Sequence, residues 1–571
     1  MDTFRIPTAA KVLAVRPVGT TAVLAELSGL HDVMALQALL LEQPLPGQVD
    51  VLAAAETVMV KADSPAAARR MPGLLLGMDL TVQAHAEGKL VVIETVYDGE
   101  DLAKVGRLTG LGTDGVIAAH SGQVWTVAFA GFAPGFGYMV GENELLHVPR
   151  RNSPRTAVPA GAVALAGTYS AVYPRKSPGG WQLIGRTAAR MWDLGRKQPA
   201  LAVPGDRVQF QAVRESVEVA VPASQALAAE QDMLESRMEP GVQSAVQSGL
   251  RVLSPGLQSL VQDLGRPGHA GLGVSASGAL DRASLRRANR VVGNQPSAAV
   301  VESVAGGLQV QAVGDQVLAV SGAPSALTVT TRRIVAPADT GGDDSEDEQV
   351  RTVPMAAAFA LLDGEILTLA VPERGFRSYL AVRGGVEVES VLGSRSTDTM
   401  SGIGPAPLAA GQVLAAGRTT ASNVVGDPEL QPEFPDAGVT VLDIVPGPRD
   451  DWFDAGALVS LCSQDWEVTP RSNRVGMRLA GEPLRRSRAG ELPSEGTVAG
   501  ALQIPPDGLP VLFLADHPIT GGYPVIAVVA DHQLDVAAQV PIGGHLRFRW
   551  ASGYVPPASH PASFPDIPQT K

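Results

Sequence analysis

The stretch that decides the fold spans residues 129–187 and reads FAGFAPGFGYMVGENELLHVPRRNSPRTAVPAGAVALAGTYSAVYPRKSPGGWQLIGRT. Glycine and proline recur at close spacing between short runs of β-branched residues, a pattern typical of strands joined by tight turns. The stretch holds five arginines and one lysine but only two carboxylates, Glu142 and Glu144, in a chain of net charge −13. Because cations on stiff loops bind anions through strong charge-assisted hydrogen bonds, the stretch predicts a protein that handles a carboxylate or a phosphate.

The composition of the chain favours several β-rich domains. A length of 571 residues is too great for one hydrophobic core, and 62 glycines with 44 prolines favour short strands and turns over long helices. Cys462 is the only cysteine, so no disulfide is expected within the chain, and the N-terminal residues show no signal-peptide pattern. Both observations favour a cytoplasmic protein.

Charge and residue spacing argue against several kinds of partner. The acidic balance is unsuited to a nucleic-acid backbone. No apolar run reaches the roughly 18–20 residues that a membrane span needs, so no membrane association is expected. The cysteine and histidines do not cluster at metal-ligand spacing, so no protein-bound metal is expected. No GxxxxGKS or GxxxxGKT phosphate loop occurs, so any ATP site would be atypical.

Periodicity outward from the central stretch divides the chain into units. Strand-like alternation over 12–27, 49–60 and 90–95, with a helical period at 31–41, predicts a small β-α-β unit. Residues 98–120 follow a helical period, and short strands alternate with glycine and proline turns from 124 to 219, as in a closed β-barrel.

The second half of the chain repeats one feature of the first. A glycine pair followed by an aromatic residue occurs at 179–181 and again at 521–523, which indicates the same barrel used twice. The acidic run at 339–349 is interpreted as a solvated insertion. The predicted domains are 1–95 (α/β cap), 96–221 (β-barrel), 222–249 (linker), 250–435 (first lobe of the second half), 436–552 (second barrel lobe) and 553–571 (flexible tail). The expected fold is therefore mainly β, with an α/β N-terminal cap and tandem barrels.

Two loops of the first half are candidates for anion binding. The glycines of 131–138 could present backbone N–H groups to an anion or simply form a tight turn, and a tight turn is favoured. Prolines brace Arg150 and Arg155 in the run 149–155, so this pair is a candidate clamp on a carboxylate or phosphate. Bonding of the same arginines to acids elsewhere on this acidic chain is equally open.

The hairpin at 173–186 supplies further candidates. Arg175 and Lys176 could neutralise developing negative charge, and Gln182 could orient a carbonyl group. His120 ends the preceding helical stretch and is a candidate base, although a lone histidine at that place is more often a hydrogen-bonding helix end.

Polar residues within glycine-rich turns open the second half. Asp263, Arg266 and Asp281 lie in such turns, and either aspartate could be a base or a magnesium ligand. For Asp281, capping of the helix expected at 284–292 is the favoured alternative. Further along, Arg474 and Arg478 lie four residues apart and would share one strand face, as a site wall or as a solvated salt-bridge ladder.

These motifs together resemble one family over nearly the whole chain. Residues 12–220 are similar to allophanate hydrolase subunit 1, which is also named the B subunit of the prokaryotic 5-oxoprolinase. Residues 250–550 are similar to allophanate hydrolase subunit 2, the C subunit of the same enzyme. Both parts also resemble the carboxyltransferase region of urea carboxylase. The resemblance implies cyclophilin-like β-barrels in two chains that usually pair, here fused into one. The motifs that carry it are GFAPGFGYM, PRRNSPRTAVPAG, YPRKSPGGWQLIGRT, QDLGRPGHAGLG, GALDRASLRRANRVVGN, YLAVRGG, LGSRSTD, SNRVGMRL and TGGYPVIA.

The chain departs from the family pattern at three places. The first strand of the family usually ends in Gly-Asp, where this chain has Gly19-Thr20. A glutamine and a lysine that often occur in the second half are replaced by Pro518 and Val525. If those groups contact substrate, the specificity of this chain differs from that of better-known members.

The resemblance implies three alternative functions. The first is the fused B and C subunits of an ATP-dependent 5-oxoprolinase, which opens the lactam of 5-oxoproline to L-glutamate together with a separate A subunit of the LamB/YcsF type. The second is a biotin-dependent carboxyltransferase acting on a urea-like or amide substrate, with biotin on a separate protein. The third is an inhibitor of a histidine kinase. The Ser-Ser-Lys amidase signature is missing, so the name allophanate hydrolase is not taken as its activity.

The leading hypothesis implies ATP with magnesium as cofactor and a small amide or lactam as substrate, while formation of a homo-oligomer stays open. The candidate catalytic residues are His120, Lys176, Gln182 and Asp263. The candidate residues for substrate or anion binding are Arg150, Arg155, Tyr173, Gly179, Gly180, Arg266, Asp281, Arg474, Gln503 and Tyr523.

Overall fold

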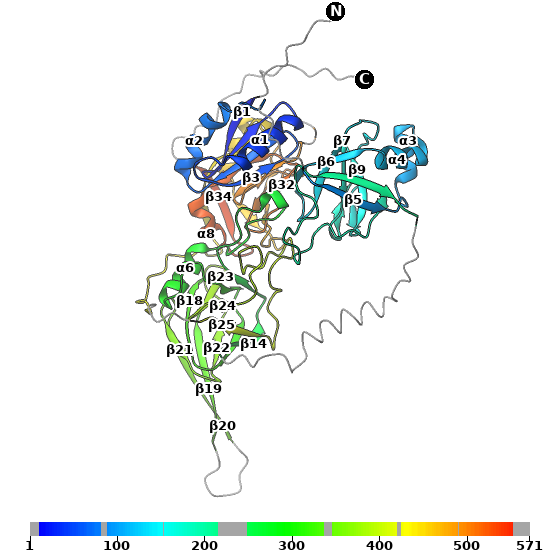
Figure 1. Ribbon diagram of the computed structural model, residues 1–571. Helices are drawn as coiled ribbons and strands as arrows, with labels where there is room; N and C mark the ends of the chain where they lie inside the picture. Colours follow the sequence, from blue (N-terminus) through cyan, green and yellow to red (C-terminus); the bar gives the residue numbers. More distant parts are fainter. Residues whose placement is uncertain are drawn as a thin grey trace, which may run out of the picture.

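The computed structural model describes residues 11–81, 88–151, 153–214, 248–335, 345–418, 424–488, 490 and 492–551. Within these residues the fold is mainly β, as expected. Figure 1 shows the N-terminal unit at the top, the sheet within residues 90–212 to its right, and the strands within residues 316–416 at the bottom. The predicted tail at 553–571 and nearly all of the predicted linker at 222–249 lie outside the described residues. The predicted domain boundaries stay predictions.

A four-stranded antiparallel sheet with two helices forms the N-terminal unit. The sheet order is β1-β2-β4-β3. The single strand expected at 12–27 is a hairpin instead, because Gly19 takes a left-handed backbone with φ 69° that permits a tight turn. Ser64 caps the second helix by accepting a hydrogen bond from the N–H of Ala67. The elements are β1 (Ala14–Val18), β2 (Ala22–Glu26), α1 (Leu30–Glu42), β3 (Gln48–Ala53), β4 (Thr57–Ala62) and α2 (Pro65–Leu76).

Both faces of this sheet are buried. Successive side chains of a strand point to opposite faces, and Val58 and Val60 of β4 pack in the cluster that contains α1 and α2. Met59, between them, packs instead with Leu24 and with Val528 of the C-terminal barrel. The N-terminal sheet therefore lies between its own helices and the barrel formed by the end of the chain, as Figure 1 shows. We call this contact between sheet and barrel the seam.

A seven-stranded sheet follows, in the order β12-β9-β10-β7-β6-β13-β5. The strand at 90–95 was expected in the N-terminal unit but pairs in parallel with β13 here. Within the described residues the sheet edges meet only at the bridge between Val96 and Arg186. The helical stretch at 98–120 is split in two by Gly110, which has a left-handed backbone. The elements are β5 (Leu90–Thr95), α3 (Leu102–Thr109), α4 (Gly112–Ser121), β6 (Val124–Ala130), β7 (Gly137–Gly141), β8 (Arg155–Val158), β9 (Ala162–Ala166), β10 (Tyr169–Val172), β11 (Ser177–Gly179), β12 (Gln182–Arg186) and β13 (Arg207–Ala212).

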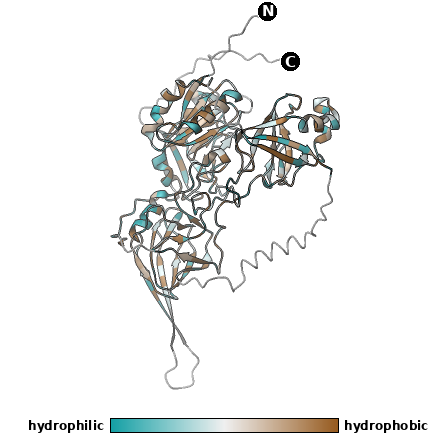
Figure 2. Cartoon of the chain, in the orientation of Figure 1, coloured by the Kyte–Doolittle hydropathy of each residue, from teal (hydrophilic) through white to brown (hydrophobic). Residues whose placement is uncertain are grey.

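Two sheets and one helix form the first lobe of the second half. The sheets have the orders β20-β19-β22-β17-β14-β25-β24 and β15-β16-β23-β18-β21. Their strands carry much of the hydrophobic sequence, shown in brown in Figure 2. The elements are β14 (Gly249–Pro255), β15 (Gln258–Gln262), η1 (Ala270–Leu272), α6 (Arg282–Val291), β16 (Val300–Val304), β17 (Leu308–Val313), β18 (Gln316–Gly322), β19 (Leu327–Val335), β20 (Ser345–Val353), β21 (Phe359–Leu361), β22 (Ile366–Leu369), β23 (Arg377–Val382), β24 (Val386–Glu387) and β25 (Val413–Ala416).

A closed barrel ends the described chain. Its strand order is β26-β33-β30-β31-β28-β27-β34, and the parallel pairing of β26 with β34 closes it. A short ribbon of β29 and β32 lies outside the barrel ladder. The elements are β26 (Val439–Pro446), η2 (Asp450–Trp452), α7 (Ala455–Ser463), β27 (Trp466–Val468), β28 (Gly476–Ala480), β29 (Glu495–Gly496), β30 (Ala501–Gln503), β31 (Val511–Phe513), β32 (Thr520–Gly521), β33 (Val525–Val529), η3 (Asp531–Gln533), α8 (Leu534–Ala537) and β34 (His545–Trp550).

Truncation of a seam residue tests this packing. Leu24 is 0% exposed and contributes to the seam cluster, so Leu24→Ala should lower the free energy of unfolding by about 2–5 kcal/mol. The exposed Leu41 of α1 is the matched control, and Leu41→Ala should change the free energy of unfolding by less than about 0.5 kcal/mol. Urea denaturation of the full chain measures both. Equal effects of the two substitutions would contradict the seam.

Candidate functional site

Glycine-rich loops from both halves meet at the seam. The N–H of Phe132 donates to Oγ1 of Thr520 at 3.2 Å, and the N–H of Gly135 donates to the carbonyl of Leu272 at 3.2 Å. A Cβ on Gly131 would come within 2.6 Å of Thr520 Oγ1, so this close approach requires glycine. Three motifs that are distant in the sequence thus converge on one place.

The loop at 131–136 does not leave its N–H groups free for an anion. The N–H of Gly131 donates to the carbonyl of Phe136, and the N–H of Ala133 donates to that of Gly131. The N–H of Phe132 is taken by Thr520. The loop is therefore a tight turn, the alternative that was favoured, and does not present its N–H groups to an anion.

A facing pair of charged residues marks the sheet side of the seam. Asp50 of β3 and Lys61 of β4 are cross-strand partners. Asp50 Oδ2 accepts hydrogen bonds from the N–H groups of Gly268 at 3.0 Å and Ala270 at 3.4 Å, which anchors the loop of the second half. Burial raises the pKa of Asp50 and lowers the pKa of Lys61.

A cavity of about 40 Å³ lies between the sheet and the second half. His517 lines it opposite Lys61, is only 9% exposed, and stacks on the ring of Phe513 with centroids 5.8 Å apart. Burial lowers the pKa of His517 to about 4, so its imidazole is neutral at pH 7. The residues that line the cavity are Asp50, Leu52, Met59, Lys61, Ala270, Val274, Ala276, Thr497, Val498, His517 and Ile519.

Sequence reasoning missed Asp50, Lys61 and His517. A usable signal was present for Lys61, which is the one charge in the otherwise apolar strand TVMVKA. No local pattern indicated that His517 lies opposite it, because the two residues come from different halves of the chain.

A larger groove of about 600 Å³ lies where the β1–β2 turn meets α2 and η3. The family departure at Thr20 falls here. Oγ1 of Thr20 and of Thr21 both donate to Asp531 Oδ2, at 2.8 and 2.7 Å. An aspartate at position 20 would place a second carboxylate against Asp531, whereas Thr20 supplies a hydrogen-bond donor.

The structure gives Arg155 carboxylate partners within the chain, and its clamp with Arg150 stays a prediction. Arg155 pairs with Glu100 at 2.8 Å and with Asp101 at 2.9 Å, and the neighbouring Arg151 pairs with Asp101 at 2.7 Å. Arg150 is exposed. The sequence could not show that acids 50 residues upstream reach this loop, and the alternative of bonding to acids elsewhere is the one found for Arg155.

The loop at 149–155 contacts the hairpin at 173–186. Gln182 Nε2 donates to the carbonyl of Pro149 at 2.9 Å, and the N–H of Arg151 donates to the carbonyl of Gly180 at 2.8 Å. The Oε1 atom of Gln182 is buried with no hydrogen-bond partner among the described residues. Lys176 is exposed in the turn before β11, so it does not share the buried surroundings of Gln182.

Tyr173 and Gly179 belong to the packing of that hairpin. Tyr173 is buried against Phe132 and Phe136, and burial raises its pKa to about 12. A Cβ on Gly179 would collide with the Tyr173 hydroxyl, so a glycine is needed there. Roles for these two residues in binding stay predictions.

Six arginines carry a buried side-chain nitrogen without a hydrogen-bond partner among the described residues, and two of the six lie in signature loops, one from each half. These two are Arg175, at Nε, and Arg266, at Nη1, whose side chain is 1% exposed. Burial lowers the pKa of each, and the charge of Asp398 opposes that shift in both. Unsatisfied buried donors of this kind point to a missing acceptor such as water or an anion.

His120 is a core residue. Its Nδ1 lies 2.7 Å from the Tyr97 hydroxyl and its Nε2 lies 2.8 Å from Oγ of Ser170, so both ring nitrogens have partners. The ring is 0% exposed, and burial lowers its pKa to about 3. This contradicts the prediction that His120 transfers a proton to substrate.

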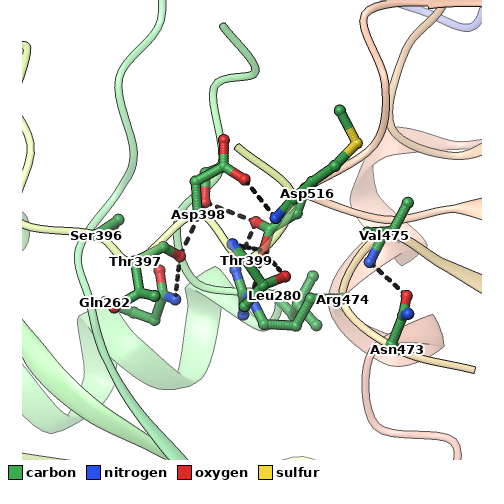
Figure 3. A network of polar contacts seen from close by, with 12 residues as sticks. Gln262, Leu280, Ser396, Thr397, Asp398, Thr399, Asn473, Arg474, Val475 and Asp516 are labelled. Atoms are coloured by element: carbon green, nitrogen blue, oxygen red, sulfur yellow. Dashed lines mark hydrogen bonds and ion pairs between the residues drawn. The ribbon is translucent and has the colours of Figure 1, made fainter. Parts of the chain in front are cut away.

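Arg474 is the centre of a buried ionic network (Figure 3). It pairs with Asp516 at 3.0 Å and closely with Glu302, and donates to the carbonyl of Gly278 at 2.6 Å. Burial alone would lower its pKa, but the two carboxylates raise it. Arg474 precedes β28 and is buried, whereas Arg478 is exposed on β28, so the predicted shared face is wrong. This network joins the first lobe to the barrel.

The two candidate aspartates have structural partners. Asp281 caps α6 through the N–H of Ser284 at 2.8 Å, as the favoured alternative predicted, and accepts from Gln539 Nε2. Burial raises the pKa of Asp281 to about 6. Asp263 accepts four hydrogen bonds, from the N–H groups of Gly265 and Arg395 and the hydroxyls of Ser394 and Ser396. Such saturation does not favour Asp263 as a base.

Gln503 and Tyr523 lie together at the edge of the barrel. Gln503 Nε2 donates to the carbonyl of Tyr523 at 3.2 Å. The Tyr523 ring is 40% exposed and the guanidinium of Arg486 lies 5.7 Å from its centroid. Contact of either residue with substrate stays a prediction.

Both halves of the chain match known carboxyltransferase domain families. Residues 13–202 match the family described as carboxyltransferase domain, subdomain C and D, and residues 272–550 match carboxyltransferase domain, subdomain A and B. The chain therefore belongs to the carboxyltransferase-domain family, and the resemblance inferred from its motifs is confirmed. Within it, the two parts of the chain are relatives of the B and C subunits of 5-oxoprolinase, joined in a single polypeptide.

Three comparisons support this assignment. The C subunit of 5-oxoprolinase from Escherichia coli (strain K12) is 33% identical over 302 residues, which are 52% of this chain and 90% of that protein. The B subunit of 5-oxoprolinase from Escherichia coli O157:H7 is 44% identical over 134 residues, 23% of this chain and 62% of that protein. The crystal structure of TTHA0988 aligns with a TM-score of 0.76 at 32% identity, covering 94% of this chain and all of that one.

Two features are absent from the part of the chain that the structure describes. None of its helices is long and apolar enough to cross a membrane. It contains no group of three or more His, Cys, Asp or Glu side chains arranged to hold a metal ion.

Loss of the Arg474 guanidinium should destabilise the chain strongly. Arg474→Met leaves Asp516 and Glu302 buried without their cation, at a cost of about 3–5 kcal/mol in the free energy of unfolding. Arg478→Met, on the exposed face of β28, should cost less than about 0.5 kcal/mol. Chemical denaturation of both variants measures the difference, and a small cost for Arg474→Met would contradict a structural role.

Proposed function

We propose that this chain is the fused B and C component of an ATP-dependent 5-oxoprolinase, which opens the lactam of 5-oxoproline to L-glutamate. The observation that carries the proposal is that two halves, one similar to the B subunit and one to the C subunit, occur in one chain and their signature loops contact one another beside the seam. A separate A subunit of the LamB/YcsF type is the partner in this proposal.

The chemistry of the reaction suits cations held on the signature loops. A lactam carbonyl resists attack by water, and activation or attack builds negative charge on its oxygen. Arg175 and Arg266 each present a buried N–H without a partner among the described residues. In this proposal they take the place first predicted for Arg150 and Arg155 and hold the substrate carboxylate or the developing oxyanion.

The described residues do not by themselves provide a ready site for ATP with magnesium. The sequence has no phosphate loop of the P-loop type, and the N–H groups of the glycine loop at 131–136 donate to protein acceptors. We therefore assign ATP binding to the complex that the chain forms with the LamB/YcsF-type partner.

Reconstitution tests the proposal directly. The purified chain mixed with a LamB/YcsF-type partner should hydrolyse ATP only when 5-oxoproline is added, and should release one glutamate per ATP. Neither protein alone should do so. A stable complex without 5-oxoproline-dependent ATP hydrolysis would defeat the proposal.

Substitution of Arg175 tests the anion site. Arg175→Met should lower kcat/KM for 5-oxoproline by about 10–100-fold, because a hydrogen bond to a charged group contributes about 1.5–3 kcal/mol. Arg186→Met is the matched control on the same hairpin, where the arginine is half-exposed and pairs with Asp98 at 2.8 Å. Steady-state kinetics of the complex would contradict the site if both variants lost equal activity.

A carboxyltransferase is the second candidate function. It is favoured by the description of both matching families as carboxyltransferase domains. The same arginines would then hold the carboxylate of carboxybiotin on a separate carrier protein. Transfer of labelled carboxylate from such a carrier to an amide, without the LamB/YcsF-type partner, would support this alternative over the first.

A further inference from the structure

Lys61 lies at the seam, and its cross-strand partner Asp50 bonds to other groups. Lys61 faces Asp50 across the β3–β4 ladder, the position in which opposite charges normally pair. Asp50 instead accepts N–H groups from Gly268 and Ala270, and no hydrogen bond or ion pair joins the Lys61 ammonium to any described residue. Lys61 is thus left lining the 40 Å³ cavity with unused donors.

The hydrogen bonds of His517 fix which ring nitrogen can accept a proton. Its Nδ1 lies 2.9 Å from the carbonyl of Pro518 and 3.2 Å from Oγ1 of Thr497. The Thr497 hydroxyl itself donates to the Pro518 carbonyl, and a carbonyl oxygen only accepts hydrogen bonds, so the proton of this group of three lies on Nδ1. Nε2 then holds a lone pair, and none of the described residues donates to it. Stacking on Phe513 holds the ring in this orientation at the cavity wall.

A free acceptor and a free cationic donor therefore line one small space. A cavity of about 40 Å³ has room for about three water molecules, since one water needs roughly 10–15 Å³. That space suits a carbonyl group and an attacking water rather than a whole substrate. Val274, Ile519 and other apolar side chains form the rest of the wall and would strengthen the electrostatic interactions within it.

We propose that His517 and Lys61 form a catalytic pair for addition of water to the lactam carbonyl, a proposal that rests on the proposed function. His517 Nε2 takes a proton from water as the water oxygen bonds to the carbonyl carbon, and Lys61 donates a hydrogen bond to the carbonyl oxygen as it becomes negative. When the carbon–nitrogen bond breaks, the proton on Nε2 passes to the leaving nitrogen, and both groups return to their starting state.

The surroundings of the pair shift the pKa values of both residues. Burial lowers the pKa of both residues, and His517 is neutral at pH 7, the form that accepts a proton. Arg282 lowers the pKa of Lys61 further, whereas Asp50 and Asp531 oppose that shift. For His517, Asp516 opposes the lowering and Lys61 adds to it.

Two isosteric variants test the pair in the reconstituted complex. His517→Asn keeps an N–H at the place of Nδ1, so the hydrogen bond to Pro518 survives while the Nε2 lone pair is lost. Lys61→Met keeps the length of the side chain without the charge. Each should lower kcat for ATP-dependent release of glutamate from 5-oxoproline by about 10²–10⁴-fold with less than a threefold change in KM.

Matched substitutions of exposed residues are the controls. His31→Asn and Lys89→Met alter side chains that are 85% and 49% exposed, and each should keep kcat within twofold. Melting curves identify a variant that fails to fold, in which case His517→Gln and Lys61→Gln replace it in the same assay. Folded variants at both positions with kcat near that of the parent chain would overturn the proposal.

If the parent complex releases no glutamate from 5-oxoproline, the proposed function is refuted but the site at His517 and Lys61 is not. A direct measurement of ligand binding then tests the site. The full chain is labelled with ¹⁵N-histidine, and the resonance absent from His517→Asn identifies His517. Addition of 5-oxoproline or of sodium bicarbonate should shift that resonance, and Lys61→Met should abolish the shift. Absence of a shift with both compounds would overturn the site.

Discussion

Burial of both faces of the N-terminal sheet is the constraint on which the rest of the structure depends. Its inner face packs on α1 and α2, and its outer face packs on the C-terminal barrel through Leu24, Met59 and Val528. Hydrophobic contact has no direction of its own. Polar bonds around the seam fix the orientation of the sheet on the barrel. Thr20 and Thr21 bond to Asp531, and Arg449 of the barrel pairs with both Glu26 and Glu495.

Charges buried in this structure fall into two groups. Arg474 and Arg449 have carboxylate partners at close range, which offsets the cost of removing them from water. The buried nitrogens of Arg175 and Arg266 lack such partners among the described residues. An unpaired buried donor costs free energy, so its persistence at a junction between two halves is better explained by a ligand than by packing.

The sequence was sufficient for the fold class and for the family, but not for the partners of the charged residues. Alternation and glycine–proline spacing predicted a mainly β chain. This prediction succeeds because the alternation of a strand depends only on residues that are neighbours in the sequence. The partners of Arg155 and His120 are not local: Glu100 and Asp101 reach the arginine loop from another element, and Tyr97 and Ser170 enclose the histidine. Strand β5 was misplaced for the same reason, because its partner β13 lies far along the chain.

The altered residues of this chain suggest how its seam differs from that of its relatives. Val525, where the family often has lysine, is buried in the same apolar cluster as Met59. Lys61 follows Met59 by two residues on β4 and therefore points to the same face of the sheet. The ammonium of the seam thus comes from the first half of the chain, while His517 comes from the second half. A site divided in this way exists only while the halves stay together, and a covalent connection makes their contact independent of protein concentration.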